Sequence, residues 1–103
     1  MIEKEKNLEK RLSSSVKSSG GLCLKLLSAH INGLPDRICL FKNSRILFVE
    51  VKSTGKTPRR IQTYMHKRIR ELGFDLRVVE TSEQIDQIIK DYGDELIKQN
   101  QRR

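Results

Sequence analysis

The sequence predicts one small α/β domain, a mixed β-sheet flanked by helices. Four short apolar runs have the length of strands and are bounded by turn-forming residues. Three longer segments repeat their apolar residues at helical spacing. The two kinds of segment follow the order α-β-β-β-α-β-α, which is typical of a sheet covered by helices.

The first helix is expected over residues 2–17, ending before a glycine pair at positions 20 and 21. Its apolar side chains recur every four residues, at Leu8, Leu12 and Val16. A first strand is expected over residues 22–27. The loop over residues 28–34 contains Asn32-Gly33, which favours a turn.

The next two strands are predicted to form a hairpin, over residues 38–41 and 45–52. The second of them is apolar on both faces until Glu50, as in a central strand. After a flexible connection, Thr57-Pro58 would supply the N-cap and first-turn proline of a second helix. Its predicted buried stripe is Ile61, Met65, Ile69 and Leu72, and Gly73 ends it.

The last two elements are a strand over residues 76–79 and a helix. Thr81 and Gln84 form a capping box at the start of that helix. Its apolar stripe is Ile85, Ile88, Ile89, Tyr92 and Leu96. The domain is therefore expected to span residues 1–97, and residues 98–103 to form a polar tail that frays.

Charge is the main compositional feature. The chain has 21 Lys and Arg against 13 Asp and Glu, a net charge of +8 that favours a nucleic-acid partner. No run approaches the roughly 18 apolar residues of a membrane span, and the N-terminus lacks a signal peptide, so we expect a cytoplasmic protein without a membrane partner. Cys23 and Cys39 lie in apolar runs and are predicted to be core residues in a reducing compartment.

The candidate site combines Asp36 with Glu50 and Lys52. On an extended strand the last two side chains leave the same face, and a hairpin could bring Asp36 to Glu50. Two carboxylates would chelate Mg²⁺ or Mn²⁺, and the ammonium could orient a water or steady phosphate charge. Charges at the end of a central strand are costly unless paired or bound to metal, which favours a site.

This arrangement resembles the PD-(D/E)XK nuclease fold, the restriction-endonuclease-like fold that Holliday junction resolvases also have. The local motifs are similar to those of the VRR-NUC family. They are carried, in order, by residues 8–12, Gly33-Leu34-Pro35-Asp36-Arg37, Phe48-Val49-Glu50-Val51-Lys52 and Gln62. The similarity continues to Val78-Val79 and so covers nearly the whole chain.

The resemblance implies a set of site residues. Asp36, Glu50 and the Val51 carbonyl would bind the metal, and Lys52 would be the catalytic lysine. Gln62 would lie near the site and contact the lysine or the substrate.

The resemblance also implies a catalytic glutamate on the first helix. Glu9 fits this position best, and Glu5, one helical turn earlier, remains the alternative.

A basic segment follows the proposed lysine. Between Lys52 and Glu71 the chain has no acidic residue, so its cations favour phosphate contact. The residues expected to contact nucleic acid are Lys56, Arg59, Arg60, His66 and Arg70. With only 5% aromatic residues, base stacking is less favoured than recognition of a branched or distorted duplex by its shape.

Three functions stay open from the sequence. The favoured one is a metal-dependent, structure-selective DNA endonuclease, with Holliday junctions as one candidate substrate. The alternatives are a non-catalytic basic nucleic-acid-binding domain with a nuclease-like fold, and a basic partner-binding protein. A homodimer is also expected, because two symmetrical cuts need two active sites. The apolar stripes of the first and last helices are its candidate interface, unless both simply cover the sheet.

Overall fold

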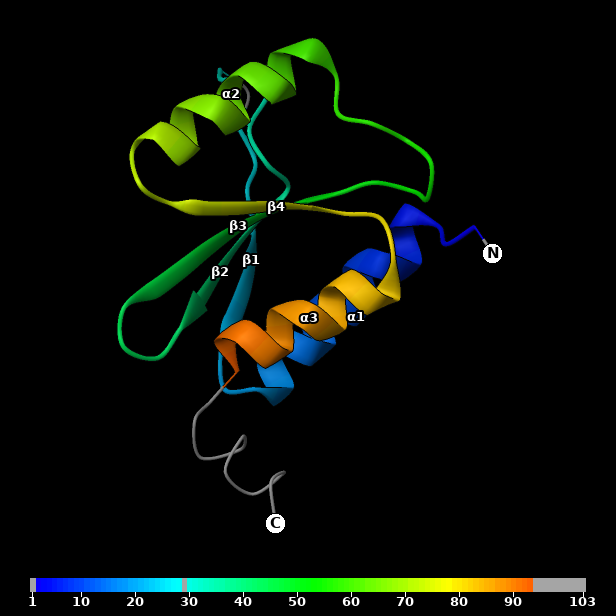
Figure 1. Cartoon of the computed structure of the whole chain (residues 1–103), viewed down its shortest axis with the longest axis vertical. Coiled ribbons are helices and arrows are strands. Elements are labelled where there is room, and N and C mark those ends of the chain that lie inside the picture. The colour runs from blue at the N-terminus through cyan, green and yellow to red at the C-terminus, as the bar shows by residue number, and fades with distance from the viewer. Residues whose placement is uncertain (1, 29, 94–103) are drawn as a thin grey trace.

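The computed structural model describes residues 2–28 and 30–93, and its elements follow the predicted order (Figure 1). In chain order they are α1 (Glu5–Ser18), β1 (Leu22–Lys25), β2 (Arg37–Phe41), β3 (Arg45–Val51), α2 (Arg60–Glu71), β4 (Asp75–Val79) and α3 (Ser82–Tyr92). Leu96 and the predicted tail lie outside the described residues.

The sheet has the strand order β1-β2-β3-β4. The first two pairings are antiparallel and β3 pairs with β4 in parallel, so the predicted mixed sheet is confirmed. α1 and α3 lie side by side on one face of the sheet, and α2, which connects β3 to β4, lies on the other (Figure 1). In the described part of the chain, no helix is long and apolar enough to cross a membrane.

The core lies between the sheet and the α1–α3 pair. Its helical contribution is the two predicted stripes, fully buried at Leu8, Leu12, Val16, Ile85 and Ile88. The strands add alternate residues, among them Leu47, Val49 and Val51 of β3. The interface predicted for a homodimer is therefore wrong, because both stripes are used to cover the sheet.

α1 begins at Glu5 and not at residue 2, because the preceding residues are used elsewhere. The Glu3 carboxylate accepts a hydrogen bond of 2.7 Å from the Ser82 backbone N–H at the start of α3. The Glu3 N–H donates to the Thr54 hydroxyl. These two contacts hold the first residues extended across the turn after β3.

The predicted start and buried stripe of α2 are both wrong. Thr57-Pro58 lies in the connection, and the N-cap residue is Arg59. Of the predicted stripe, Met65 and Ile69 are only half-buried, and Ile61 and Leu72 are 44% and 69% exposed. The buried side chains are polar, Gln62 and His66, because this helix faces the charged end of β3.

Two smaller predictions concern the start of α3 and the two cysteines. The capping box of α3 forms, with Gln84 N–H donating to the Thr81 hydroxyl and Thr81 N–H donating to the Gln84 side-chain oxygen. Cys39 is buried and Cys23 half-buried, opposite each other on neighbouring strands, and both thiols are free.

Candidate active site

The carboxyl end of β3 brings the two predicted acids together. In the β2–β3 register Arg37 faces Val49, so the preceding residue, Asp36, stands opposite Glu50. Because side chains alternate along a strand, Glu50 and Lys52 leave β3 on the side of α2, away from the apolar core.

Glu50 is buried, with 1% of its surface exposed. Its Oε2 accepts a hydrogen bond of 2.8 Å from the Gln62 side-chain amide. The Lys52 ammonium lies 3.1 Å from the same oxygen. Gln62 thus contacts the carboxylate and not the lysine. The side-chain oxygen of Gln62 accepts a hydrogen bond from the Arg59 backbone N–H, and this contact fixes the orientation of the amide.

The second oxygen of Glu50 faces His66. Glu50 Oε1 and His66 Nε2 are 3.9 Å apart, which is too long for a hydrogen bond. Both atoms are buried, and neither has a hydrogen-bond partner among the described residues. Buried polar atoms of this kind are rare in folded proteins and often mark the place of a water or an ion.

The electrostatics of the site follow from this burial. Burial raises the pKa of Glu50, and the charge of Asp36 raises it further, while Lys52 and Gln62 act in the opposite direction. Burial also lowers the pKa of His66, and the neighbouring cation Arg70 adds to that. A second positive charge near Glu50 would therefore be favourable.

Asp36 is held in place by backbone contacts. Its Oδ2 accepts a hydrogen bond of 2.8 Å from the Val51 N–H. The loop before Asp36 packs closely against α2, since a Cβ added at Gly33 (φ +84°) would lie 2.7 Å from the Ile61 carbonyl oxygen. Only glycine tolerates both this contact and this φ.

The chemistry of these donors fits a hard divalent cation. Within residues 2–28 and 30–93, no group of three or more His, Cys, Asp and Glu side chains could hold a metal unaided. Two carboxylates and the Val51 carbonyl are nevertheless the oxygen donors that Mg²⁺ accepts, because this ion keeps several waters and takes substrate phosphate as a ligand. The partnerless Glu50 Oε1 supplies one such donor.

The structure does not bring Glu9 to this group. Its carboxylate lies 3.9 Å from the Arg37 guanidinium, on the side of the sheet that α1 covers. Glu50 and Lys52 point to the opposite side. Glu5 is exposed, and its N–H donates to the hydroxyl of Ser53, the residue after Lys52, so the alternative at Glu5 stays a prediction.

The predicted nucleic-acid residues fall into two groups. Lys56, Arg59 and Arg60 are exposed in and beside the connection that follows the site. Arg70 is also exposed, but its guanidinium donates a hydrogen bond to the Leu76 carbonyl. His66 is 2% exposed, so the prediction that it contacts phosphate is wrong.

One contributor to the site has a position that the sequence did not indicate. His66 lies on the buried face of α2 and not on the exposed face that the charge pattern predicts. Its spacing of four residues from Gln62 could have indicated a shared face toward Glu50.

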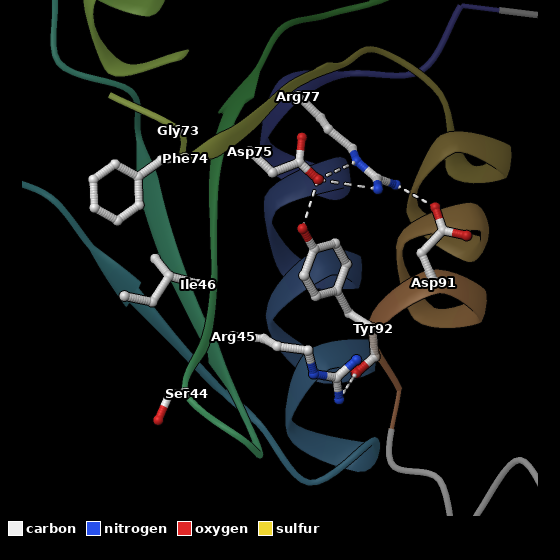
Figure 2. A pocket seen from close by; sticks show the side chains of 9 residues that line it. All are labelled: Ser44, Arg45, Ile46, Gly73, Phe74, Asp75, Arg77, Asp91 and Tyr92. Atoms are coloured by element: carbon white, nitrogen blue, oxygen red, sulfur yellow. Dashed lines mark hydrogen bonds and ion pairs between the residues drawn. The ribbon is translucent and has the colours of Figure 1, made fainter. Parts of the chain in front are cut away.

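A concave surface lies at the opposite end of β3 (Figure 2). Its charged side chains have partners within the protein, and Arg45 donates to the Tyr92 carbonyl. Asp75 accepts hydrogen bonds from the Tyr92 hydroxyl (2.6 Å) and from Arg77, and Arg77 also pairs with Asp91 at 2.7 Å. This network connects α3 to β4 and is structural.

Comparison with known proteins gives the family. No family model matches the chain. A curated protein named "Putative nuclease p44", from Acyrthosiphon pisum secondary endosymbiont phage 1, is 35% identical over 80 residues, which are 78% of this chain and 86% of that protein. A solved structure described as a VRR_NUC domain is similar with a TM-score of 0.79 and 31% identity, covering 85% of this chain and 96% of that one. With this fold and this similarity over most of its length, the chain belongs to the VRR-NUC family of nucleases.

Proposed function

We propose that the protein is a metal-dependent endonuclease that hydrolyses phosphodiester bonds in DNA. The observation that carries this proposal is the buried Glu50 carboxylate, which has Lys52 and Gln62 on one oxygen and no partner on the other. Asp36 stands opposite it on β2. A buried charge with a free oxygen beside a second carboxylate is what a cation site requires.

Each residue has a separate role in this chemistry. Asp36, Glu50 and the Val51 carbonyl would hold Mg²⁺ or Mn²⁺. When bound, such an ion polarises a phosphoryl oxygen and lowers the pKa of a bound water. Lys52 presents an ammonium on the same face as Glu50, where it orients the attacking water or stabilises charge on the phosphate. Gln62 fixes the rotamer of Glu50.

The proposed substrate is branched or otherwise structured duplex DNA, with Holliday junctions as one candidate. Exposed cations at Lys56, Arg59 and Arg60 begin four residues after Lys52, where they could hold phosphates beside the site. Such contacts carry no sequence information, which favours recognition by shape. Since a similar protein belongs to a phage of a bacterial endosymbiont, we place the activity in the cytoplasm of a bacterial host.

We also propose a homodimer, through a surface other than the predicted helical stripes. The face of β1–β3 that α1 and α3 leave uncovered carries two cross-strand rows, Leu22–Leu40–Ile46 and Leu24–Ile38–Phe48. We call these six residues the open sheet face. Leu22 and Leu24 are 59% and 44% exposed. With a net charge of +8, two copies repel through their basic surfaces, so an uncharged face is the favourable contact.

Cleavage in a defined substrate panel tests the proposed function. We expect nicking of a four-way junction or a flap in Mg²⁺ or Mn²⁺, less cleavage of a linear duplex, and none in EDTA. Binding of all three DNAs without cleavage in either metal would instead favour a non-catalytic nucleic-acid-binding domain.

A further inference from the structure

A buried histidine stands beside the proposed metal-binding carboxylate without a partner. The side chain of His66 is 3% exposed, and its Nε2 has no hydrogen-bond partner among the described residues. It comes from α2, one turn after Gln62, so both side chains leave the helix on the face that covers the end of β3.

The carboxylate that His66 faces is satisfied on one side only. Oε2 of Glu50 is held by Gln62 and Lys52, whereas Oε1 has no partner among the described residues. Oε1 and the imidazole Nε2 are 3.9 Å apart, about 1 Å longer than a hydrogen bond. A shift of that size would satisfy two buried polar atoms at once. Hydrogen bonds in active sites are often long before substrate arrives and shorten in the working complex.

We propose that His66 is a positioning residue for Glu50, donating from Nε2 to Oε1 and so setting the affinity of the site for its divalent cation. Gln62 and His66 together would hold both oxygens of Glu50 from one helix. One lone pair of Oε1 then remains for the cation. This role rests on the proposed function only in assuming that Glu50 binds a cation.

Direct metal binding tests this role without DNA. Isothermal titration of Mn²⁺ into the DNA-free protein gives the affinity for wild type, His66→Leu and His66→Gln. We expect His66→Leu to weaken Mn²⁺ binding about 10- to 100-fold, as for other residues that orient a metal ligand. His66→Gln should keep most of the wild-type Mn²⁺ affinity, because a glutamine amide can donate near the position of Nε2. His30→Leu, at the other histidine of the chain, is the matched control, because His30 is exposed on a loop.

Thermal unfolding, pulsed EPR and DNA cleavage are measured beside the Mn²⁺ affinity. Thermal unfolding reports whether each variant folds, and His66→Ala replaces His66→Leu if the leucine does not. Equal Mn²⁺ affinity in wild type and His66→Leu would overturn the proposal, as would the absence of Mn²⁺ binding by wild type. Nitrogen coupling of an imidazole in the pulsed EPR spectrum of bound Mn²⁺ would also overturn it, by making His66 a ligand. Loss of Mn²⁺ affinity in a protein that cleaves no DNA would reject the nuclease proposal and leave this one standing.

Discussion

Among single residues, the buried carboxylate of Glu50 affects both the stability of the fold and the proposed binding of a cation. Desolvation and the charge of Asp36 both raise its pKa. A carboxyl whose folded-state pKa exceeds the unfolded value favours folding while protonated, and this contribution is lost as pH rises through the folded-state pKa. In metal-free protein at neutral pH, Glu50 is therefore destabilising.

The first prediction is that Glu50→Gln raises the stability of metal-free protein at pH 7. We expect the free energy of unfolding to rise by about 1 kcal/mol, which corresponds to about 4–8 °C in the thermal midpoint of a domain of this size. Unfolding in EDTA at several pH values measures it. The advantage should shrink toward acid pH, where Glu50 is protonated in both states. A variant less stable than wild type at pH 7 would contradict the stated environment of Glu50.

At the scale of elements, the site depends on how the loop before β2 meets α2. Gly33 and Gly55 both have positive φ, +84° and +87°. Only at Gly33 would a Cβ collide with another element, 2.7 Å from the Ile61 carbonyl, since a Cβ at Gly55 meets nothing within 4 Å.

The second prediction compares alanine at these two glycines. Both variants lose about 1 kcal/mol from the positive φ alone. Gly33→Ala should lose at least another ~1 kcal/mol, because backbone must move. It should also cleave more slowly, since the same loop holds Asp36. Denaturant unfolding and a cleavage assay measure the pair, and equal losses in the two variants would show that the loop does not press on α2.

The third prediction concerns the connection between β3 and α2. Replacing Lys56, Arg59 and Arg60 together with Gln should weaken binding to every DNA sequence. The slope of log affinity against log salt should become shallower by about 0.9 for each phosphate that the variant no longer neutralises. The control replaces three exposed lysines of α1 and α3, Lys10, Lys17 and Lys90, and should leave that slope closer to the wild-type value. An equal fall in both triple variants would mean that only net charge matters.

At the scale of the whole molecule, the two faces of the sheet differ in what they leave exposed. α1 and α3 cover the apolar core on one face, whereas the open sheet face has exposed leucines on the edge strand β1. An exposed apolar face on an edge strand favours association with a second copy of the chain.

The fourth prediction is therefore a dimer at micromolar concentration that Leu24→Glu converts to monomer. Sedimentation equilibrium measures both states. Leu72→Glu, at a leucine that is 69% exposed at the end of α2, is the control and should remain dimeric. A wild-type monomer that cuts both strands of a junction without pairing on DNA would exclude the dimer.

The sequence predicted the order of elements and the α1 and α3 stripes, because apolar periodicity determines both. It failed where polar groups replace apolar ones. The stripe through Ile61 and Leu72 has the correct helical spacing, but the buried face of α2 carries Gln62 and His66 because Glu50 lies beneath it. Similarly, the start of α1 depends on Glu3 reaching Ser82, 79 residues away in the chain. Periodicity within one element contains no information on such contacts.

Cleavage by variants of Asp36 and Glu50 tests the proposed metal centre. Single-turnover rates on a four-way junction in Mg²⁺ and Mn²⁺ should fall at least about 10³-fold in Asp36→Asn and in Glu50→Gln, because each change removes a charge that holds the cation at the phosphate. Asp86→Asn is the matched control, since Asp86 pairs with Arg11 on the far side of the core, and it should cut at the wild-type rate. DNA binding and folding should survive in all three variants. Cleavage by either site variant within about twofold of wild type would contradict a metal centre at Asp36 and Glu50.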